Sequence, residues 1–246
     1  MSPSAPPPPY RSRFLGSREA AEQTRSFQFE KPSDFGFEAG QFMEVTLPSQ
    51  GDAPSQSLTH PFSIASAPSE PRLMITTRMR NSDFKRLLGS LPPGAEVTLA
   101  GPFGDLTLHE DPSRPAVFLT GGIGVTPFRS IVLSAEHRKL PHRILMFYSN
   151  RRPEDAAFLE ELRASERKNP NFRLIPTITQ PGVSRQHWNG EQGHVDAAMI
   201  ERYSTDAATA IYYIAGPPRM VQGLSAVLSG AGIERERVRT EEFDGY

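Results

Sequence analysis

The segment FLTGGIGVTP, residues 118–127, decides the fold of the second half of the chain. An apolar run at residues 116–120 leads into it and predicts a short buried strand of a parallel sheet. Three glycines follow and allow a tight turn, because glycine has no Cβ to obstruct it. Pro127 suits the first turn of a helix, which we expect at about residues 128–138. Because the helix N-terminus offers free N–H groups and a positive dipole end, we expect this turn to bind an anion such as a dinucleotide pyrophosphate.

The glycine turn differs from the usual Rossmann fingerprint. Pro127 stands where that fingerprint has its third glycine, and no carboxylate ends the next strand. A strand–helix turn that binds nothing is the alternative interpretation. GGIGVTP is, however, similar to the nicotinamide-nucleotide motif of the ferredoxin–NADP reductase superfamily, and this resemblance implies that the turn binds NADPH or NADH.

The composition of the chain excludes several classes of protein. Its 246 residues are enough for one large core or two modest ones, and 27 Lys and Arg balance 28 Asp and Glu. We therefore expect neither nucleic-acid binding nor membrane insertion, and the absence of an N-terminal apolar segment favours a cytoplasmic protein. The chain has no cysteine, which excludes disulfides and cysteine-bound iron–sulfur clusters, and its six histidines lack the spacing of metal ligands. An organic cofactor must then carry any electrons, and we expect no metal site.

Two patterns of secondary structure divide the chain. Residues 1–9 contain five prolines and predict a disordered tail. Short strands at residues 13–17, 24–29, 41–47, 62–65, 72–77 and 96–100, with a helix at 83–88, predict an antiparallel β-barrel. Strands at 116–120, 143–148, 172–179, 210–215 and 237–243 alternate with helices at 128–138, 153–168, 195–202 and 217–229, which predicts a doubly wound parallel sheet. We place the barrel domain at residues 10–112 and the α/β domain at residues 113–246.

The sequence HPFSIAS, which begins at His60, offers chemistry that suits a flavin. An aromatic ring can cover one face of the isoalloxazine, a hydroxyl can bond a ring nitrogen, and a basic side chain can meet a phosphate. The segment resembles the Arg-x-Tyr-Ser flavin motif of the same superfamily, about sixty residues ahead of the glycine turn. The resemblance implies that Phe62 packs on the flavin and that Ser63 contacts its redox-active edge. His60 replaces the usual phosphate-binding arginine, as in the dehydrogenase domains of ferric reductases and NADPH oxidases.

The segment ITTRMRNSDFKRLL, residues 75–88, is the next element of the family. Arg78 and a helix N-terminus at Asn81 and Ser82 could bind a pyrophosphate, which implies FAD rather than FMN. The alternative is a solvated basic face, which could also meet an acidic electron-transfer partner. GPFGDLTL, residues 101–108, matches the family turn that closes the barrel.

Three further segments of the α/β domain bear on the nucleotide and the flavin. The tip of its second strand is Tyr148-Ser149-Asn150-Arg151-Arg152, with no acid before Glu154. Because NADH-specific sites place a carboxylate there, this tip predicts NADPH. The alternative is that these residues only begin the next helix, whose N-terminus Pro153, Glu154 and Asp155 suit. IAGPPRM, residues 214–220, resembles the Cys-Gly-Pro-Pro motif that faces the nicotinamide, with alanine in place of the cysteine. The end of the chain, TEEFDGY, matches the last strand of the family, which delivers an acid and an aromatic residue to the flavin.

The resemblance predicts an FAD-dependent NAD(P)H reductase that passes single electrons to ferredoxin or flavodoxin. We expect the protein to be a monomer. The reductase component of an oxygenase, a ferric or free-flavin reductase, and a redox-silent binding module are the alternatives. The predicted catalytic residues are Ser63 and Glu242. The predicted cofactor-binding residues are His60, Pro61, Phe62, Ser63, Thr77, Arg78, Asn81, Ser82, Thr120, Gly121, Gly122, Gly124, Thr126, Pro127, Ser149, Arg151, Gly216, Pro217, Met220, Phe243 and Tyr246.

Overall fold

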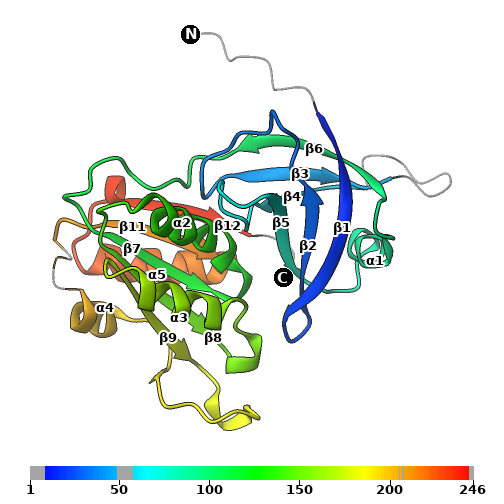
Figure 1. Cartoon of the computed structure of the whole chain (residues 1–246). Helices are drawn as coiled ribbons and strands as arrows, with labels where there is room; N and C mark the ends of the chain where they lie inside the picture. Colours follow the sequence, from blue (N-terminus) through cyan, green and yellow to red (C-terminus); the bar gives the residue numbers. More distant parts are fainter. Residues whose placement is uncertain (1–8, 49–57, 205, 207, 244–246) are drawn as a thin grey trace.

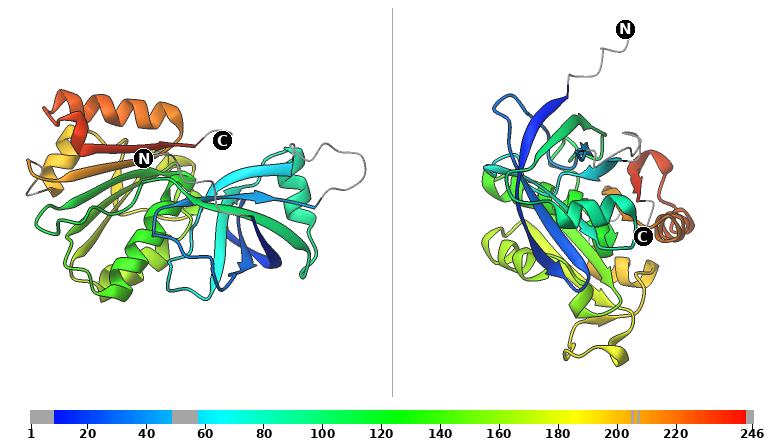
Figure 2. Two further views of the ribbon diagram at one scale, coloured as in Figure 1. Left: turned by 90° about the horizontal axis from the view of Figure 1, so that it is seen from above. Right: turned by 90° about the vertical axis from the view of Figure 1, so that its right-hand side faces the viewer.

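The computed structural model describes residues 9–48, 58–204, 206 and 208–243, and these residues form two sheets that lie side by side (Figures 1 and 2). Most of the predicted Pro-rich tail lies outside the described residues. The first sheet is antiparallel and the second is parallel. The two predicted fold classes are therefore confirmed, in the predicted order along the chain.

The antiparallel sheet comes from the first hundred residues. Its strands are β1 (Tyr10–Ala21), β2 (Thr24–Glu30), β3 (Phe42–Thr46), β4 (Thr59–Ser63), β5 (Arg72–Arg78) and β6 (Glu96–Phe103), in the order β4-β3-β6-β1-β2-β5. The Ala65 N–H donates to the Met74 carbonyl oxygen at 2.8 Å, and this bond draws the two edge strands together into a barrel. Helix α1 (Asp83–Ser90) covers one end with Phe84 and Leu88, and Ser82 caps it as predicted by accepting from the Lys85 N–H.

The parallel sheet follows, with strands β7 (Ala116–Gly121), β8 (Ile144–Asn150), β9 (Phe172–Ile178), β10 (Glu191–Gln192), β11 (Ile211–Gly216) and β12 (Val238–Glu242) in the order β10-β9-β8-β7-β11-β12. One face packs on α2 (Val125–Arg138) and α3 (Leu159–Lys168), and the other on α4 (Ala197–Tyr203) and α5 (Pro218–Gly230). All six residues of β7 are buried because helices cover both faces of the sheet, which is why its first four residues are apolar.

The helix predicted at residues 153–168 is interrupted in the structure. A single 3-10 turn, Pro153–Asp155, comes first, and α3 begins only at Leu159. Phe158 lies between them with a φ of 61°, in the left-handed region, and its ring packs 5.0 Å from the Arg129 guanidinium. The predicted helix after Pro127 begins earlier than expected, at Val125, and β10 was not predicted.

The segment that joins the two sheets is anchored on the second of them. The Nδ1 atom of His109 and the Tyr213 hydroxyl share a hydrogen bond of 2.8 Å. The backbone N–H of His109 donates to the same oxygen at 2.9 Å. The domain boundary at residue 112 stays a prediction. Within the described residues, no helix is both long and apolar enough to cross a membrane.

Candidate cofactor-binding site

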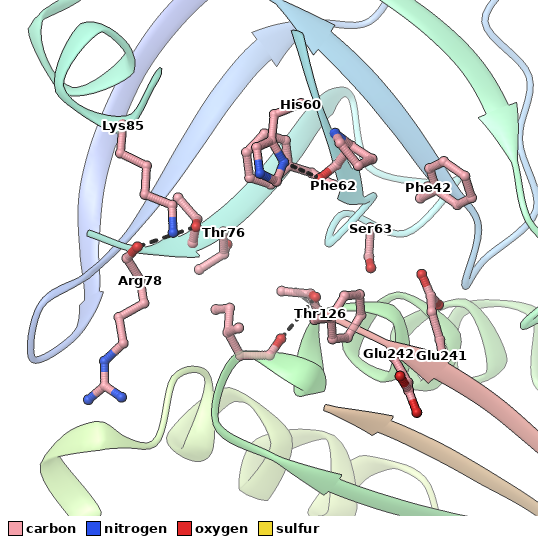
Figure 3. Close-up of a pocket in the computed structure, with 14 residues that line it drawn as sticks. Phe42, His60, Phe62, Ser63, Thr76, Arg78, Lys85, Thr126, Glu241 and Glu242 are labelled. Atoms are coloured by element: carbon pink, nitrogen blue, oxygen red, sulfur yellow. Dashed lines mark hydrogen bonds between the residues drawn. The ribbon is translucent and has the colours of Figure 1, made fainter. Parts of the chain in front are cut away.

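A cavity of about 550 Å³ lies where the barrel meets the parallel sheet (Figure 3). The barrel contributes residues of β3, β4, β5 and α1, and the second half contributes the start of α2 and the end of β12. The lining residues are Phe42, His60, Pro61, Phe62, Ser63, Thr76, Thr77, Arg78, Lys85, Ile123, Thr126, Glu241, Glu242 and Phe243. We refer to this space as the first cavity.

Ser63 is the buried polar group that distinguishes the first cavity. It is the last residue of β4 and only 5% exposed. Its Oγ is buried and has no hydrogen-bond partner within the described residues. A buried hydroxyl without a partner costs free energy, on the order of 1–3 kcal/mol, so a ligand that bonds it gains that amount. A ring nitrogen or carbonyl of a flavin is a suitable partner.

Aromatic rings form one wall of the first cavity. His60 and Phe62 share a face of β4 and stack at 4.9 Å between ring centroids, with 29° between their planes. Phe84 of α1 lies 5.5 Å and 5.6 Å from the two rings. His60 therefore belongs to an aromatic stack, as well as standing at the position predicted to meet a phosphate. This wall suits a flat, heteroaromatic ligand.

Two cations reach the first cavity. Lys85 is buried, and burial first and the charge of Arg80 second lower the pKa of its amine. Figure 3 shows Lys85 reaching down from α1 toward Arg78, whose guanidinium pairs with Asp155 at 3.4 Å. Sequence analysis missed Lys85, because on a helix it counts as one more charge of a basic face.

Asn81 and Ser82, two of the predicted phosphate ligands, lie outside the lining of the first cavity. The Ser82 hydroxyl caps α1 through the Lys85 N–H at 3.3 Å. Asn81 accepts a hydrogen bond from Arg86 at 2.5 Å. Their role in binding a pyrophosphate stays a prediction.

The end of β12 closes the first cavity from the second half of the chain. Glu242 is exposed, whereas Glu241 is more buried, and burial first and the charge of Asp105 second raise the pKa of Glu241 to about 7. Phe243 follows and donates its N–H to the Gly216 carbonyl at 3.0 Å. Sequence analysis selected Glu242 and missed Glu241. The spacing could have shown it, because residues two apart on a strand share a face, and Glu241 is two before Phe243.

A second cavity, of about 840 Å³, adjoins the first, and both include Arg78 and Ile123 in their lining. Of the predicted residues it contains Gly121, Gly122, Ser149, Arg151, Pro217 and Met220. Sequence analysis missed Thr24, Arg80, Asn150, Asp155, Thr179, Gln180, His194, Val195, Arg219, Gly223, Leu224 and Val227, which also line it. Many of these residues come from loops remote in sequence, and only the fold brings them together.

The glycine turn lies against β11 at the floor of the second cavity. A Cβ on Gly124 would lie 2.3 Å from the Ala215 carbonyl oxygen, so only glycine fits there. Thr120 donates to that same carbonyl at 3.0 Å, and Thr126 donates to the Ile123 carbonyl at 3.0 Å. Four predicted residues belong to the lining of neither cavity and lie in or beside the turn: Thr120, Gly124, Pro127 and Gly216.

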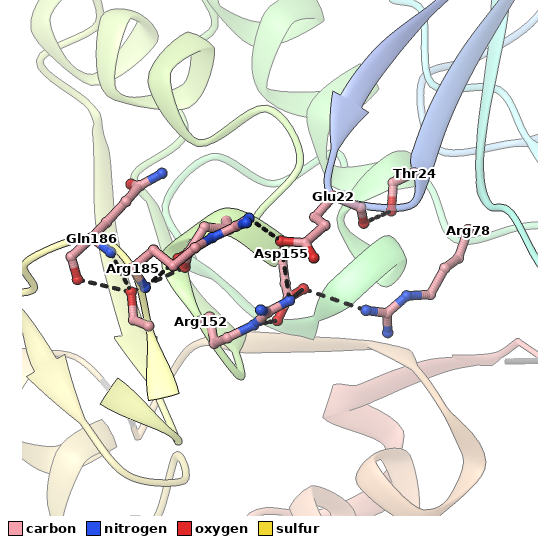
Figure 4. A network of polar contacts seen from close by, with 9 residues as sticks. Glu22, Thr24, Arg78, Arg152, Asp155, Arg185 and Gln186 are labelled. Atoms are coloured by element: carbon pink, nitrogen blue, oxygen red, sulfur yellow. Dashed lines mark hydrogen bonds and ion pairs between the residues drawn. The ribbon is translucent and has the colours of Figure 1, made fainter. Parts of the chain in front are cut away.

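The second cavity is rich in positive charge. Arg78, Arg80, Arg151 and Arg219 line it, and Asp155 is the single carboxylate in its lining. Figure 4 shows Asp155 held between Arg78 and Arg152, and Arg152 bonds it at 2.8 Å. The charge of Asp155 is therefore largely neutralised, and the cavity suits an anionic ligand.

Arg151 and Arg152 have different surroundings. Arg152 is half-buried and pairs with Asp155 and, at 3.4 Å, with Glu22 of the barrel, which also binds Arg185 at 2.6 Å (Figure 4). Arg151 is exposed, and within the described part of the chain no ion pair holds its side chain. The predicted aromatic Tyr246 lies outside the described residues. Within them, no group of three or more His, Asp or Glu could hold a metal ion.

The amino-acid sequence is similar to those of known reductases. Residues 118–226 match the model of the oxidoreductase NAD-binding domain family. The chain is 30% identical to ferredoxin–NADP reductase B of Sorangium cellulosum, over 96% of the chain and 98% of that protein. It is 29% identical to the glycine betaine monooxygenase reductase subunit of Chromohalobacter salexigens, over 90% of the chain but 60% of that protein.

Solved structures share the whole fold. A ferredoxin NADP+ reductase from Neisseria gonorrhoeae, with bound FAD and NADP, has a TM-score of 0.78 at 20% identity, over 95% of this chain and 98% of that one. The cytochrome b5 reductase domain of Ulva prolifera nitrate reductase has a TM-score of 0.79 at 17% identity, over 96% of this chain and 98% of that one.

Proposed function

The chain belongs to the ferredoxin–NADP reductase superfamily, and from this membership we propose that it takes a hydride from NADPH onto FAD and passes single electrons to a ferredoxin or flavodoxin. That it is an oxidoreductase of this type follows from a relative 30% identical over nearly the full length of both proteins. The cofactors are proposed from the two cavities, and the acceptor is proposed from the similar proteins.

The observation that carries the proposal is the junction of the two cavities at Arg78 and Ile123. The first has an aromatic wall and a hydroxyl without a partner among the described residues, which suit a flavin, and the second has a glycine turn and four arginines, which suit a dinucleotide. A hydride moves only between rings in contact, so two sites that share a wall provide the necessary proximity.

The residues of the first cavity fit FAD. Phe62 and His60 would cover a face of the ring system, Ser63 would bond its polar edge, and Arg78 and Lys85 would meet phosphate oxygens. When bound, FAD supplies the step from two-electron to one-electron chemistry. Glu241 and Phe243 would close the cavity from β12, where Glu241 can hold or release a proton near neutral pH because its pKa is about 7.

The residues of the second cavity favour NADPH over NADH. The additional ribose phosphate of NADPH needs a cation and no free carboxylate at the tip of β8. Ser149 and Arg151 are there, Arg219 of α5 lines the same cavity, and Asp155 is already paired. We therefore assign Arg151 to the phosphate.

The electron acceptor has one specific alternative. The relative from Chromohalobacter salexigens is named as the reductase subunit of a monooxygenase, and it is nearly as similar as the ferredoxin–NADP reductase. An oxygenase component is therefore the second candidate acceptor.

Released flavin and acceptor assays test this proposal. We expect the purified protein to be yellow and to release FAD on denaturation. NADPH should bleach it without oxygen, and the reduced protein should pass electrons to ferredoxin or flavodoxin from the same cell. A colourless protein that takes up no FAD would show that it is a redox-silent module. Release of FMN alone would refute the FAD assignment, and transfer only to an oxygenase would select the second acceptor.

A further inference from the structure

Arg129 is a charged residue almost completely buried in the protein. It lies on α2, five residues after Gly124, and its side chain is 2% exposed. Burial lowers the pKa of a guanidinium, but the hydrogen bonds that Arg129 donates to Glu161 and Glu70 outweigh burial and raise its pKa. A buried charge of this kind is retained only where it is well paired, so its contacts indicate what it does.

The contacts of Arg129 join the two halves of the chain. Its guanidinium donates to the Ala65 carbonyl at 2.6 Å and to both oxygens of Glu70, at 2.9 Å and 3.2 Å. Both residues follow β4 in the barrel half. In the α/β half it donates to Glu161 of α3 at 2.7 Å and 2.6 Å, and it lies 5.0 Å from the Phe158 ring centroid.

The next residue of α2 holds the next peptide of the barrel. The Ser130 hydroxyl donates to the Ser66 carbonyl at 2.7 Å. The barrel side of this contact is also fixed, because the Met74 N–H donates to Ser66 Oγ at 3.0 Å and the Ala67 N–H donates to Glu70 at 2.5 Å. Arg129 and Ser130 of α2 therefore donate to the consecutive carbonyls of Ala65 and Ser66, in a segment that the barrel's own hydrogen bonds also fix.

These contacts connect the segment after one wall of the first cavity to the helix that follows the glycine turn of the second cavity. Ala65 comes two residues after Ser63, which lines the first cavity, and Arg129 is on the helix that begins at the glycine turn of the second. We propose that Arg129 is a positioning residue for hydride transfer, which fixes the nicotinamide-binding turn against the flavin-binding strand. This inference rests on the proposed function.

Arginine is suited to this role because its planar guanidinium offers five donors in a fixed arrangement. Lysine carries the charge but has only three donors on a single nitrogen, so it cannot make the five hydrogen bonds that Arg129 donates to Ala65, Glu70 and Glu161. Hydride transfer is sensitive to such a change, since a misplacement of about 1 Å far from the reacting atoms can reduce a rate on the order of a hundredfold.

The test uses the FAD-loaded full chain with Arg129→Lys, Arg129→Met and the matched control Arg138→Met, which alters an exposed arginine at the end of the same helix. Anaerobic stopped-flow mixing with saturating NADPH gives the rate of flavin reduction. We expect this rate to fall on the order of ten- to a hundredfold in Arg129→Met and less in Arg129→Lys. NADPH affinity, FAD content and reoxidation by ferricyanide should stay within about threefold of wild type, because each reports on one site alone.

A second measurement does not depend on catalysis. Hydrogen exchange of the nucleotide-free protein should become faster at residues 64–67 and 121–124 in both Arg129 variants and stay unchanged in Arg138→Met. If Arg129→Met does not fold, Arg129→Lys and Glu161→Gln carry the same test, and each should reduce the rate at constant NADPH affinity.

Two results would overturn this inference alone. Folded Arg129 variants that are reduced as fast as wild type would show that the contact does not position the two sites. Losses of FAD binding and NADPH binding as large as the loss of rate would show that Arg129 serves only stability. A wild-type protein that binds no FAD would overturn the proposed function and this inference with it.

Discussion

Arg151 and Arg152 show how neighbouring residues of the same type can have different surroundings. Arg152 is fixed by Asp155 and Glu22 across the junction of the two halves, and Arg151 faces the second cavity. Sequence analysis selected Arg151 without a means of excluding Arg152, and the ion pairs of Arg152 support that choice, which stays a prediction.

We expect Arg151→Ala to weaken NADPH binding on the order of ten- to a hundredfold, because a hydrogen bond to a charged group contributes about 1.5–3 kcal/mol. NADH, which lacks the phosphate, should be nearly unaffected. Steady-state kinetics with both nucleotides measures this, and Arg152→Ala is the comparison, expected to lower stability more than it changes nucleotide preference. Equal losses for NADPH and NADH in Arg151→Ala, or a wild type that prefers NADH, would contradict the assignment.

Glu241 gives a pH dependence of stability with a defined sign. Its folded-state pKa of about 7 lies above the ordinary value of 4.5, so the folded protein holds this proton more tightly than the unfolded chain. Its contribution is therefore present below pH 4.5 and is lost as the pH rises through 7. Between about pH 5 and pH 8 the free energy of unfolding should fall by about 2–3 kcal/mol from this group.

Denaturant titrations of the cofactor-free protein across this pH range check the prediction for Glu241. Glu241→Gln should remove the fall, and Glu242→Gln, which alters an exposed neighbour, should keep it. If wild type and Glu241→Gln respond to pH in the same way, burial does not hold the proton on Glu241.

At the scale of elements, the sequence predicted most strands and helices because each buries a periodic apolar face. It did not predict where α3 begins, because the left-handed Phe158 is stabilised by a ring contact with Arg129, which is remote in the sequence. Site residues carried by motifs, such as Ser63 and the glycine turn, were predictable. Residues such as Arg219 and Asp155 were not, because nothing in their local sequence indicates that they share a cavity.

The turn between β7 and α2 makes a prediction about Gly124. We expect Gly124→Ala to destabilise the protein by about 1–3 kcal/mol, since its Cβ would overlap the Ala215 carbonyl. NADPH affinity should fall as the turn moves, and FAD should still bind. Chemical denaturation and nucleotide titration measure the two effects. Gly230→Ala is the control, because a Cβ there meets no atom within 4 Å; a Gly124→Ala variant as stable as this control would contradict the close approach.

At the scale of the whole molecule, Arg78 belongs to both cavities and pairs with Asp155 across the junction. We expect Arg78→Ala to weaken FAD binding on the order of ten- to a hundredfold, through loss of a charge-assisted contact. Arg80→Ala is the matched control, because Arg80 lines the second cavity only and its loss should leave FAD affinity unchanged. Fluorescence titration of the cofactor-free protein with FAD measures both, and equal FAD affinities in the two variants would remove Arg78 from the phosphate site.

The paired contacts of Arg129 and Ser130 with Ala65 and Ser66 also restrict how such proteins can recombine. A gene fusion that joins the barrel of this chain to the nucleotide half of a distant relative inherits the two sides of that contact from different ancestors. Such a chimera should fold as two halves yet transfer hydride poorly until the helix residues and the segment after β4 are exchanged together. We therefore expect hydride transfer in such proteins to require that both sides of this contact, one from each half of the chain, come from the same ancestor.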